Sequence, residues 1–397
     1  MDPYANAPWA NDETLPVPIL VSAPNPDTKS DAITTLAGVS LKVIGYDRLV
    51  GSESLLFNKE LDAVGVGVGS AQSPGSIQFM EENQPVTYYY PMSSATSATR
   101  YNYTFFAFHI PAGNYPGSFD GDGHYVVSFP LDQSTRAGNQ DILVASAQAT
   151  NYVLQTDILN DDNSVRYEHG SYAGFNARYQ RITYLDGYRS ASGDAAAKMA
   201  AGQANMEANQ PKLYFSHCTA RIILNAKAVD QHAEDSFDNS TGSGLKIRLK
   251  SILQANARAK VKLDVSAAIG LNGNNYNAPD IQVLTWDTST SEVTTANVMS
   301  VDVAPAVKPL VAGARMHLDD CLYIVPGSDA ITLTYQISNN SSPTVDMTKT
   351  IAPPTGGFLP GRTYTYNLTV DSDEAINMTA LLGGWSEGGT EDTPALN

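Results

Sequence analysis

Apolar and polar residues alternate along several stretches of the second half of the chain. The alternation runs through 245–250, 260–265, 331–338 and 363–370. A period of two places apolar side chains on one face of a strand and polar side chains on the other. Strands of this kind, separated by turns, are typical of antiparallel β-sandwiches. The residues that we expect to face the core are Leu245, Ile247, Leu249, Val261, Leu263, Val265, Ile331, Leu333, Tyr335, Ile337, Tyr364, Tyr366, Leu368 and Val370.

The first half of the chain also predicts strands, with less regular patterns. The stretch "LPVPILVSAP" (15–24) is short, apolar and flanked by prolines, which suits a strand at the edge of a sheet. A second strand is expected within 35–47. In 103–110 both alternating faces are apolar, so we expect this strand to be buried on both sides or to meet a neighbouring domain.

Residues 190–209, "SASGDAAAKMAAGQANMEAN", differ from the rest of the chain. Alanine and methionine without β-branched residues predict a short helix or helical linker. We place the domain boundary there. The predicted organisation is an N-terminal segment (1–29), a first β-sandwich domain (30–209, ending in the linker) and a second β-sandwich domain (210–397). Alternating helix–strand units are missing, so a Rossmann or TIM-barrel architecture is not expected.

Composition supports two folded domains and disfavours some classes of binding partner. The chain has 397 residues, of which 42% are hydrophobic and 16% charged, so it can bury two cores of ordinary size. The net charge of −17 disfavours nucleic acid and anionic lipid as partners. No apolar run reaches the ~18 residues that span a membrane. The start, "MDPYANAPWAN", has no pattern of a signal peptide.

His217 and Cys218 lie side by side in the apolar run "LYFSHCTARIIL" (213–224). A thiol active site would need the imidazole within hydrogen-bonding distance of the thiol. In a regular strand, successive side chains point to opposite faces, so His217 shares a face with Phe215 and Thr219 while Cys218 takes the other. We therefore expect a structural histidine that is hydrogen-bonded to a polar neighbour.

Cys218 and Cys321 are the two cysteines of the chain. Both fall in segments predicted to be strands of the second domain. They form either a disulfide, worth about 4 kcal/mol in the chain-entropy model, or two separate buried thiols. The sequence leaves both alternatives open.

Other candidate sites have ordinary structural explanations. The glycines at 65, 67 and 69 lack the rest of a nucleotide-binding pattern and suit a hairpin or an edge strand. "DGDG" (120–123) lacks the remaining ligands of a calcium loop, and Asp-Gly is common in hairpin turns. The histidines at 109, 124, 169, 217, 232 and 317 form no metal-binding motif. We predict no catalytic, cofactor-binding or metal-binding residue and no enzymatic activity.

Six short stretches, in order along the chain, resemble the fimbrillin family, the type V pilins of Bacteroides-type bacteria. They are "YYYPMSS" with "YNYTFFAFHIPAG", "QDILVASA" (140–147), "LYFSHCTARI" (213–222), "LYIVPG" (322–327), "FLPGRTYTYNLTV" (358–370), and Ile376 with "GGWSEGG" (383–389). Together they extend over about three quarters of the chain. By this resemblance, "LYFSHC" opens the second domain.

The resemblance implies a fold and a function. The fold is two transthyretin-like antiparallel β-sandwiches in tandem, within the all-β class. The function is that of a fimbrial subunit, exported as an outer-membrane lipoprotein to the cell surface and taking part in adhesion. A protease removes the N-terminal strand of such pilins, and a strand of another copy or of a related pilin replaces it.

Applied to this chain, the resemblance makes "LPVPILVS" (15–22) the displaceable strand, with Leu15, Val17, Ile19 and Val21 at its alternate positions. Lys29 is the candidate processing site or an ordinary solvated lysine, because the first arginine, Arg48, lies at the end of the next strand. The family usually cleaves after arginine, and no lipid-anchor cysteine is present here. The alternative function is therefore a tip or accessory adhesin that binds a glycan or a host protein without polymerising, using the aromatic segments at 88–108.

Overall fold

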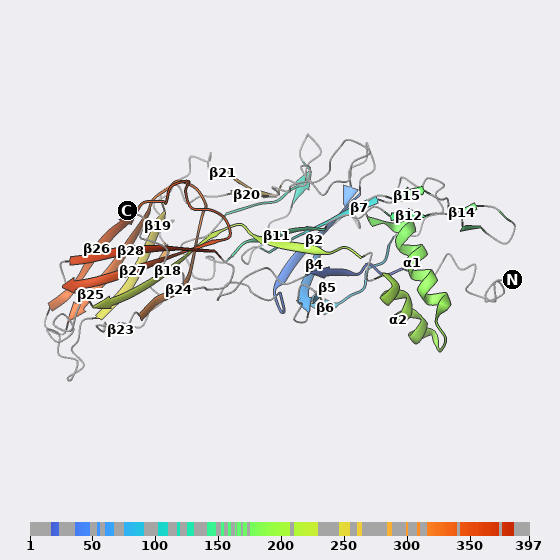
Figure 1. Cartoon of the computed structure of the whole chain (residues 1–397), viewed down its shortest axis with the longest axis horizontal. Coiled ribbons are helices and arrows are strands. Elements are labelled where there is room, and N and C mark those ends of the chain that lie inside the picture. Colours follow the sequence, from blue (N-terminus) through green and yellow to red (C-terminus); the bar gives the residue numbers. More distant parts are fainter. Residues whose placement is uncertain are drawn as a thin grey trace.

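The computed structural model describes residues 17–23, 36–47, 54–55, 60–66, 75–90, 102–109, 117–119, 125–130, 141–147, 152–154, 158–159, 163, 165–167, 170–172, 175–206, 210–228, 246–254, 260–263, 284–287, 299–300, 308–309, 316–339, 342–372 and 375–384. Over these residues the chain consists mainly of strands, with two helices (Figure 1). The predicted all-β class is confirmed, and the sheets are mostly antiparallel. The transthyretin-like arrangement stays a prediction.

The first sheet has ten strands and returns to its starting strand. Its path is β1 (Val21–Ala23), β5 (Gly75–Glu81), β4 (Leu61–Val66), β2 (Ser40–Asp47), β7 (Asn102–His109), β11 (Leu143–Ala147) and β17 (Leu213–His217), while β3 (Ser54–Leu55), β6 (Gln84–Pro85) and β16 (Phe175–Asn176) pair beside it. A parallel bridge between Ser22 and Lys212 joins the two ends of this order. The sheet therefore closes around its core.

Strand β7 lies in the middle of this sheet, between β2 and β11. Phe105, Phe106, Ala107 and Phe108 are all buried. Successive side chains of a strand point to opposite faces, so both faces of β7 are covered here. The expected burial of this strand on both sides is confirmed.

Helices α1 (Ala177–Ser190) and α2 (Ala195–Met206) form a hairpin that packs on the core of the first sheet. Tyr184 and Leu185 of α1 and Met206 of α2 belong to that core. The hairpin lies at the end of the first sheet that is remote from the second sandwich (Figure 1). The helix predicted within 190–209 is confirmed, but its expected role as a linker between the domains is wrong, because its buried side chains anchor it to the first core.

The second sandwich consists of two sheets. One has the order β24 (Met316–Ile324), β18 (Ala220–Ala228), β27 (Arg362–Ser372), β28 (Ala375–Gly384). The other has β22 (Met299–Ser300) and β23 (Lys308–Pro309) beside β19 (Lys246–Gln254), followed by β25 (Ile331–Asn339) and β26 (Ser342–Ile351). The pair β18–β27 is parallel, which the prediction of antiparallel sheets did not anticipate.

The core of the second sandwich contains most of the alternating apolar residues that the sequence predicted. The predicted residues whose side chains are buried are Ile247, Ile331, Leu333, Tyr335, Tyr364, Tyr366, Leu368 and Val370. The side chains of the other predicted core residues lie outside the described part. The opposite face of β27 is less exposed to solvent than expected, since Thr363 and Asn367 are also buried. Asn225 donates a hydrogen bond to the Asn367 side chain at 3.0 Å on that face.

Shorter strands complete the described part. A sheet of β10 (Ser128–Pro130), β20 (Lys260–Leu263) and β21 (Leu284–Asp287) joins segments from both halves of the chain. The small pairs are β8 (Ser118–Phe119) with β9 (Tyr125–Val126), β12 (Tyr152–Leu154) with β15 (Gly170–Tyr172), and β13 (Ile158–Leu159) with β14 (Val165–Tyr167).

The stretch 213–222 does not form one strand that opens the second sandwich, as the sequence led us to expect. Its first part is β17, which pairs antiparallel with β11 and completes the first sheet. Its second part enters β18 of the second sandwich. The chain passes from one sheet to the other at Cys218 and Thr219.

Candidate functional site

The N-terminal strand segment, which we define as Val17–Ala23, is hydrogen-bonded on both sides. The Ile19 N–H donates to the Tyr88 carbonyl at 2.8 Å, and the Val17 carbonyl accepts from the Tyr90 N–H at 2.9 Å. Farther along, Val21–Ala23 pairs antiparallel with Ile77–Gly75. On the other side, the Ser22 N–H donates to the Pro211 carbonyl at 3.0 Å. The segment thus has β5 and Tyr88–Tyr90 on one side and the residues just before β17 on the other.

The predicted edge position agrees with the strand order, in which β1 comes first, although Ser22 also bonds to Pro211 on the second side. Successive backbone N–H groups of an extended strand point to opposite sides. The Ile19 N–H points to Tyr88, so the nitrogen of Pro18 faces the other side, where no bond to Tyr88–Tyr90 is lost. The missing N–H of Pro18 therefore costs no hydrogen bond to Tyr88–Tyr90, as is typical of a proline at the edge of a sheet.

The side chains of Val17, Ile19, Val21 and Ala23 point into the first core and are each at most 2% exposed. Full burial of a valine or isoleucine stabilises a fold by about 1.5–3 kcal/mol, so the three larger side chains together contribute about 5–9 kcal/mol. This is comparable to the whole stability of a typical domain. Val17, Ile19 and Val21 thus belong to the first core, and their displacement stays a prediction. Leu15 and Lys29 lie outside the described residues.

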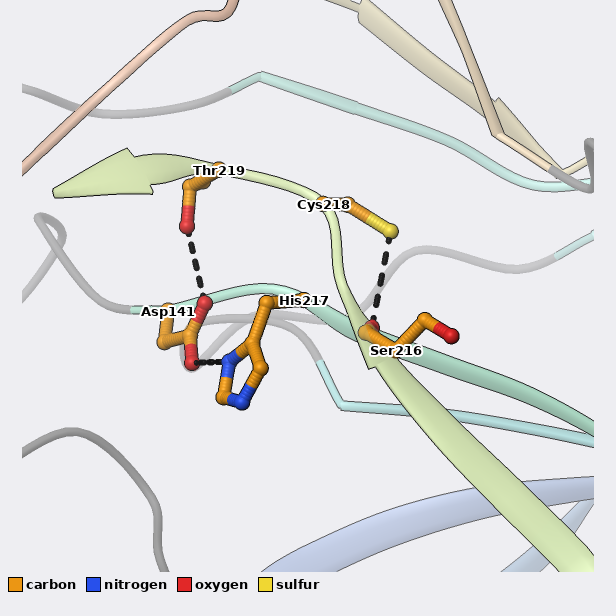
Figure 2. Close-up of polar contacts among 5 residues, drawn as sticks. All are labelled: Asp141, Ser216, His217, Cys218 and Thr219. Carbon is orange, nitrogen blue, oxygen red and sulfur yellow. Dashed lines mark hydrogen bonds and ion pairs between the residues drawn. The ribbon is translucent and has the colours of Figure 1, made fainter. Parts of the chain in front are cut away.

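A second cluster of polar side chains lies where the chain leaves the first sheet. Asp141, two residues before the start of β11, is fully buried and accepts a hydrogen bond from the Thr219 hydroxyl at 2.8 Å. It also pairs with Nδ1 of His217 (Figure 2). The predicted structural histidine with a polar partner is confirmed. Sequence reasoning missed Asp141 itself, although an aspartate directly before the apolar run "ILVASA" was a usable signal.

Backbone contacts reinforce this junction. The Cys218 N–H donates to the Ile142 carbonyl at 2.9 Å, and the Gly361 N–H donates to the Thr219 carbonyl at 2.9 Å. Gly361 has φ +66°, a conformation that glycine adopts without strain. The junction therefore ties together the first sheet, the crossing chain and the loop before β27.

The thiol of Cys218 points away from the His217 imidazole (Figure 2). Its sulfur lies 3.7 Å from the Ser216 carbonyl. Burial raises the pKa of the Cys218 thiol far above its ordinary value, with the Asp141 carboxyl group acting in the same direction. The pair is thus not arranged as a thiolate and its base. Cys218 is a free thiol, so the alternative of a Cys218–Cys321 disulfide is wrong.

The other sequence candidates contribute little to a site. Gly67, Gly69 and the stretch 120–123 lie outside the described residues. In the aromatic segments only Tyr89, at 40% exposure, is an exposed large side chain among the described residues. Within the same described ranges, no cluster of three potential metal ligands occurs. The described helices include none long and apolar enough to cross a membrane.

Neither a protein-family model nor a curated protein sequence matches the chain. Several solved structures are similar to it. One is a cell adhesion protein from Bacteroides uniformis, 13% identical with a TM-score of 0.42, covering 93% of this chain and 98% of that one. Another is a fimbrial protein from Bacteroides vulgatus, 13% identical with a TM-score of 0.39, covering 93% and 99%. The fimbrial anchor protein Mfa2 from Porphyromonas gingivalis is 10% identical with a TM-score of 0.30, covering 93% and 98%.

Proposed function

We propose that this chain is a subunit of bacterial surface fimbriae and assembles by exchange of its N-terminal strand segment. The observation that carries the proposal is the position of Val17–Ala23. A short segment near one end of the chain supplies four buried side chains to a core that the rest of the first sheet completes. The ordered motifs described above resemble those of fimbrial subunits.

Strand exchange suits this geometry because most of the binding is independent of sequence. The hydrogen bonds to Tyr88, Tyr90 and Pro211 are made by the main chain, so any extended strand in the same register can make them. Specificity comes from the apolar side chains at alternate positions. Because the N-terminal segment of each copy has been released, the strand that restores the core comes from another part of a second copy or from a related subunit.

Removal of the segment without a replacement exposes the apolar core that Val17, Ile19 and Val21 cover. The resulting loss of about 5–9 kcal/mol provides the drive to bind another strand. In the proposal, proteolysis after Lys29 releases the segment, and the subunit then polymerises at the cell surface. Export as a lipoprotein and a role in adhesion are parts of the same proposal.

The alternative function, a glycan- or protein-binding tip adhesin, would need an exposed aromatic surface. Tyr90, Phe105, Phe106 and Phe108 are buried, so the predicted aromatic segments supply little of one. We therefore keep the polymerising subunit as the proposed function.

The test compares the full chain with a variant that lacks residues 1–29, by size-exclusion chromatography with light scattering. The truncated variant is expected to form multimers that grow with concentration. A matched control adds an excess of the peptide 15–23, which should occupy the vacant position and keep the variant monomeric. A truncated variant that folds and stays monomeric without the peptide would refute strand exchange.

A further inference from the structure

Ser22 is the one polar residue of the N-terminal strand segment, and its hydroxyl is buried. The residue is 3% exposed and lies between Val21 and Ala23, each 2% exposed. Its side chain is on the face opposite to theirs, because successive residues alternate. The Ser22 hydroxyl oxygen has no hydrogen-bond partner among the residues that the structure describes.

A buried hydroxyl without a partner loses its hydrogen bonds to water and gains none in return. The backbone of Ser22 shows no such defect, since its N–H donates to the Pro211 carbonyl and the residue pairs with Ser76. The free-energy penalty therefore arises from the Ser22 hydroxyl alone. A strand with alanine at this position would keep every main-chain contact and avoid the penalty.

We propose that Ser22 weakens the binding of the N-terminal strand segment to the first sheet. This favours its replacement by an incoming strand that has a small apolar residue at the position of Ser22. This inference rests on the proposed strand exchange. The preferred partner is an extended segment with aliphatic residues at the positions of Val17, Ile19 and Val21 and alanine at the position of Ser22. Because a ligand shifts an equilibrium only by its differential affinity, the missing penalty directs exchange toward that strand.

The first test measures opening of the segment in the intact, uncut chain by hydrogen exchange with mass spectrometry. Ser22→Ala is expected to slow exchange in 17–23 about tenfold, equivalent to 1.4 kcal/mol. The matched control is Ser76→Ala, which changes an exposed serine paired with Ser22 in the register and should leave that exchange unchanged. Unchanged or faster exchange in Ser22→Ala would overturn the inference.

The second test uses two synthetic peptides, LPVPILVSA and LPVPILVAA, which compete for the chain after it has been cut with trypsin between the segment and β2. The alanine peptide should bind about tenfold more tightly. Equal binding of the two peptides would overturn the inference while leaving strand exchange intact. If neither peptide binds but Ser22→Ala still slows exchange in the uncut chain, the proposed exchange fails and the weakness of the segment stands.

Discussion

Replacing Asp141 by alanine should destabilise the protein more than most single substitutions. The carboxyl group of Asp141 is fully buried and accepts hydrogen bonds from Thr219 and His217. A hydrogen bond to a carboxylate contributes about 1.5–3 kcal/mol, and Asp141→Ala removes two of them and leaves Thr219 without its buried acceptor. We expect a loss of about 3–5 kcal/mol in the free energy of unfolding, measured by urea titration with two spectroscopic probes.

Two controls define what this loss means. Asp62→Ala removes the exposed ion pair with Lys42 and should cost less than about 1 kcal/mol. Thr219→Val removes one donor to Asp141 at nearly constant volume, and its effect should not add to that of Asp141→Ala, because both variants break the same hydrogen bond. A loss below about 1 kcal/mol for Asp141→Ala, or full additivity of the two variants, would refute the role assigned to the junction.

Three further predictions concern buried residues. Gly65→Ala should reduce the free energy of unfolding by at least about 3 kcal/mol in urea titration, because a Cβ there would lie 2.0 Å from the Leu36 carbonyl oxygen. A mild effect would contradict the close approach of β4 to the backbone of Leu36. Cys218 should react with a thiol reagent at pH 8 only after unfolding, since burial raises its pKa, and rapid labelling of native protein, resolved from Cys321 by peptide mapping, would contradict its placement. Burial also raises the pKa of the Tyr366 hydroxyl in the folded state. The stability that the neutral hydroxyl contributes is therefore complete below about pH 10, where the unfolded chain also keeps the proton. It falls by up to about 1.4 kcal/mol per pH unit as the pH rises toward the folded-state pKa. Tyr366→Phe should show a shallower decline between pH 9 and 11, and an unchanged slope would contradict this cause.

The strands of the second core were predictable because their side chains alternate with a period of two. Ile331, Leu333 and Tyr335 follow that pattern and are buried as expected. Local alternation does not reveal which sheet a strand joins, since its partners are distant in sequence. Strand β17 was therefore assigned to the wrong sandwich, although the alternation of its side chains was recognised.

Helix α1 was missed for a different reason. Its sequence, ARYQRITYLDGYRS, contains a glycine and several aromatic and β-branched residues, which are weak helix formers. The spacing of Ile182 with Leu185, and of Tyr184 with Tyr188, was the available signal, because positions three and four apart share one helix face. Their burial shows that packing against the first core outweighs the low intrinsic propensity.

The polar junction was only half predictable from sequence. Alternation along the strand placed His217 and Thr219 on one face, which the structure confirms, since both contact Asp141. Their shared partner lies 76 residues before His217, and no local pattern connects them. Such a contact follows from the pairing of β11 with β17, which only the fold determines.

The most direct test of strand exchange is limited trypsin digestion of the folded full chain, followed by incubation and an unboiled denaturing gel. Strand exchange predicts one early cut after Lys29, verified by mass spectrometry, and then a ladder of detergent-resistant multimers. Lys29→Gln should show neither the cut nor the ladder. A clean cut after Lys29 that leaves only monomers on the gel would contradict polymerisation by strand exchange.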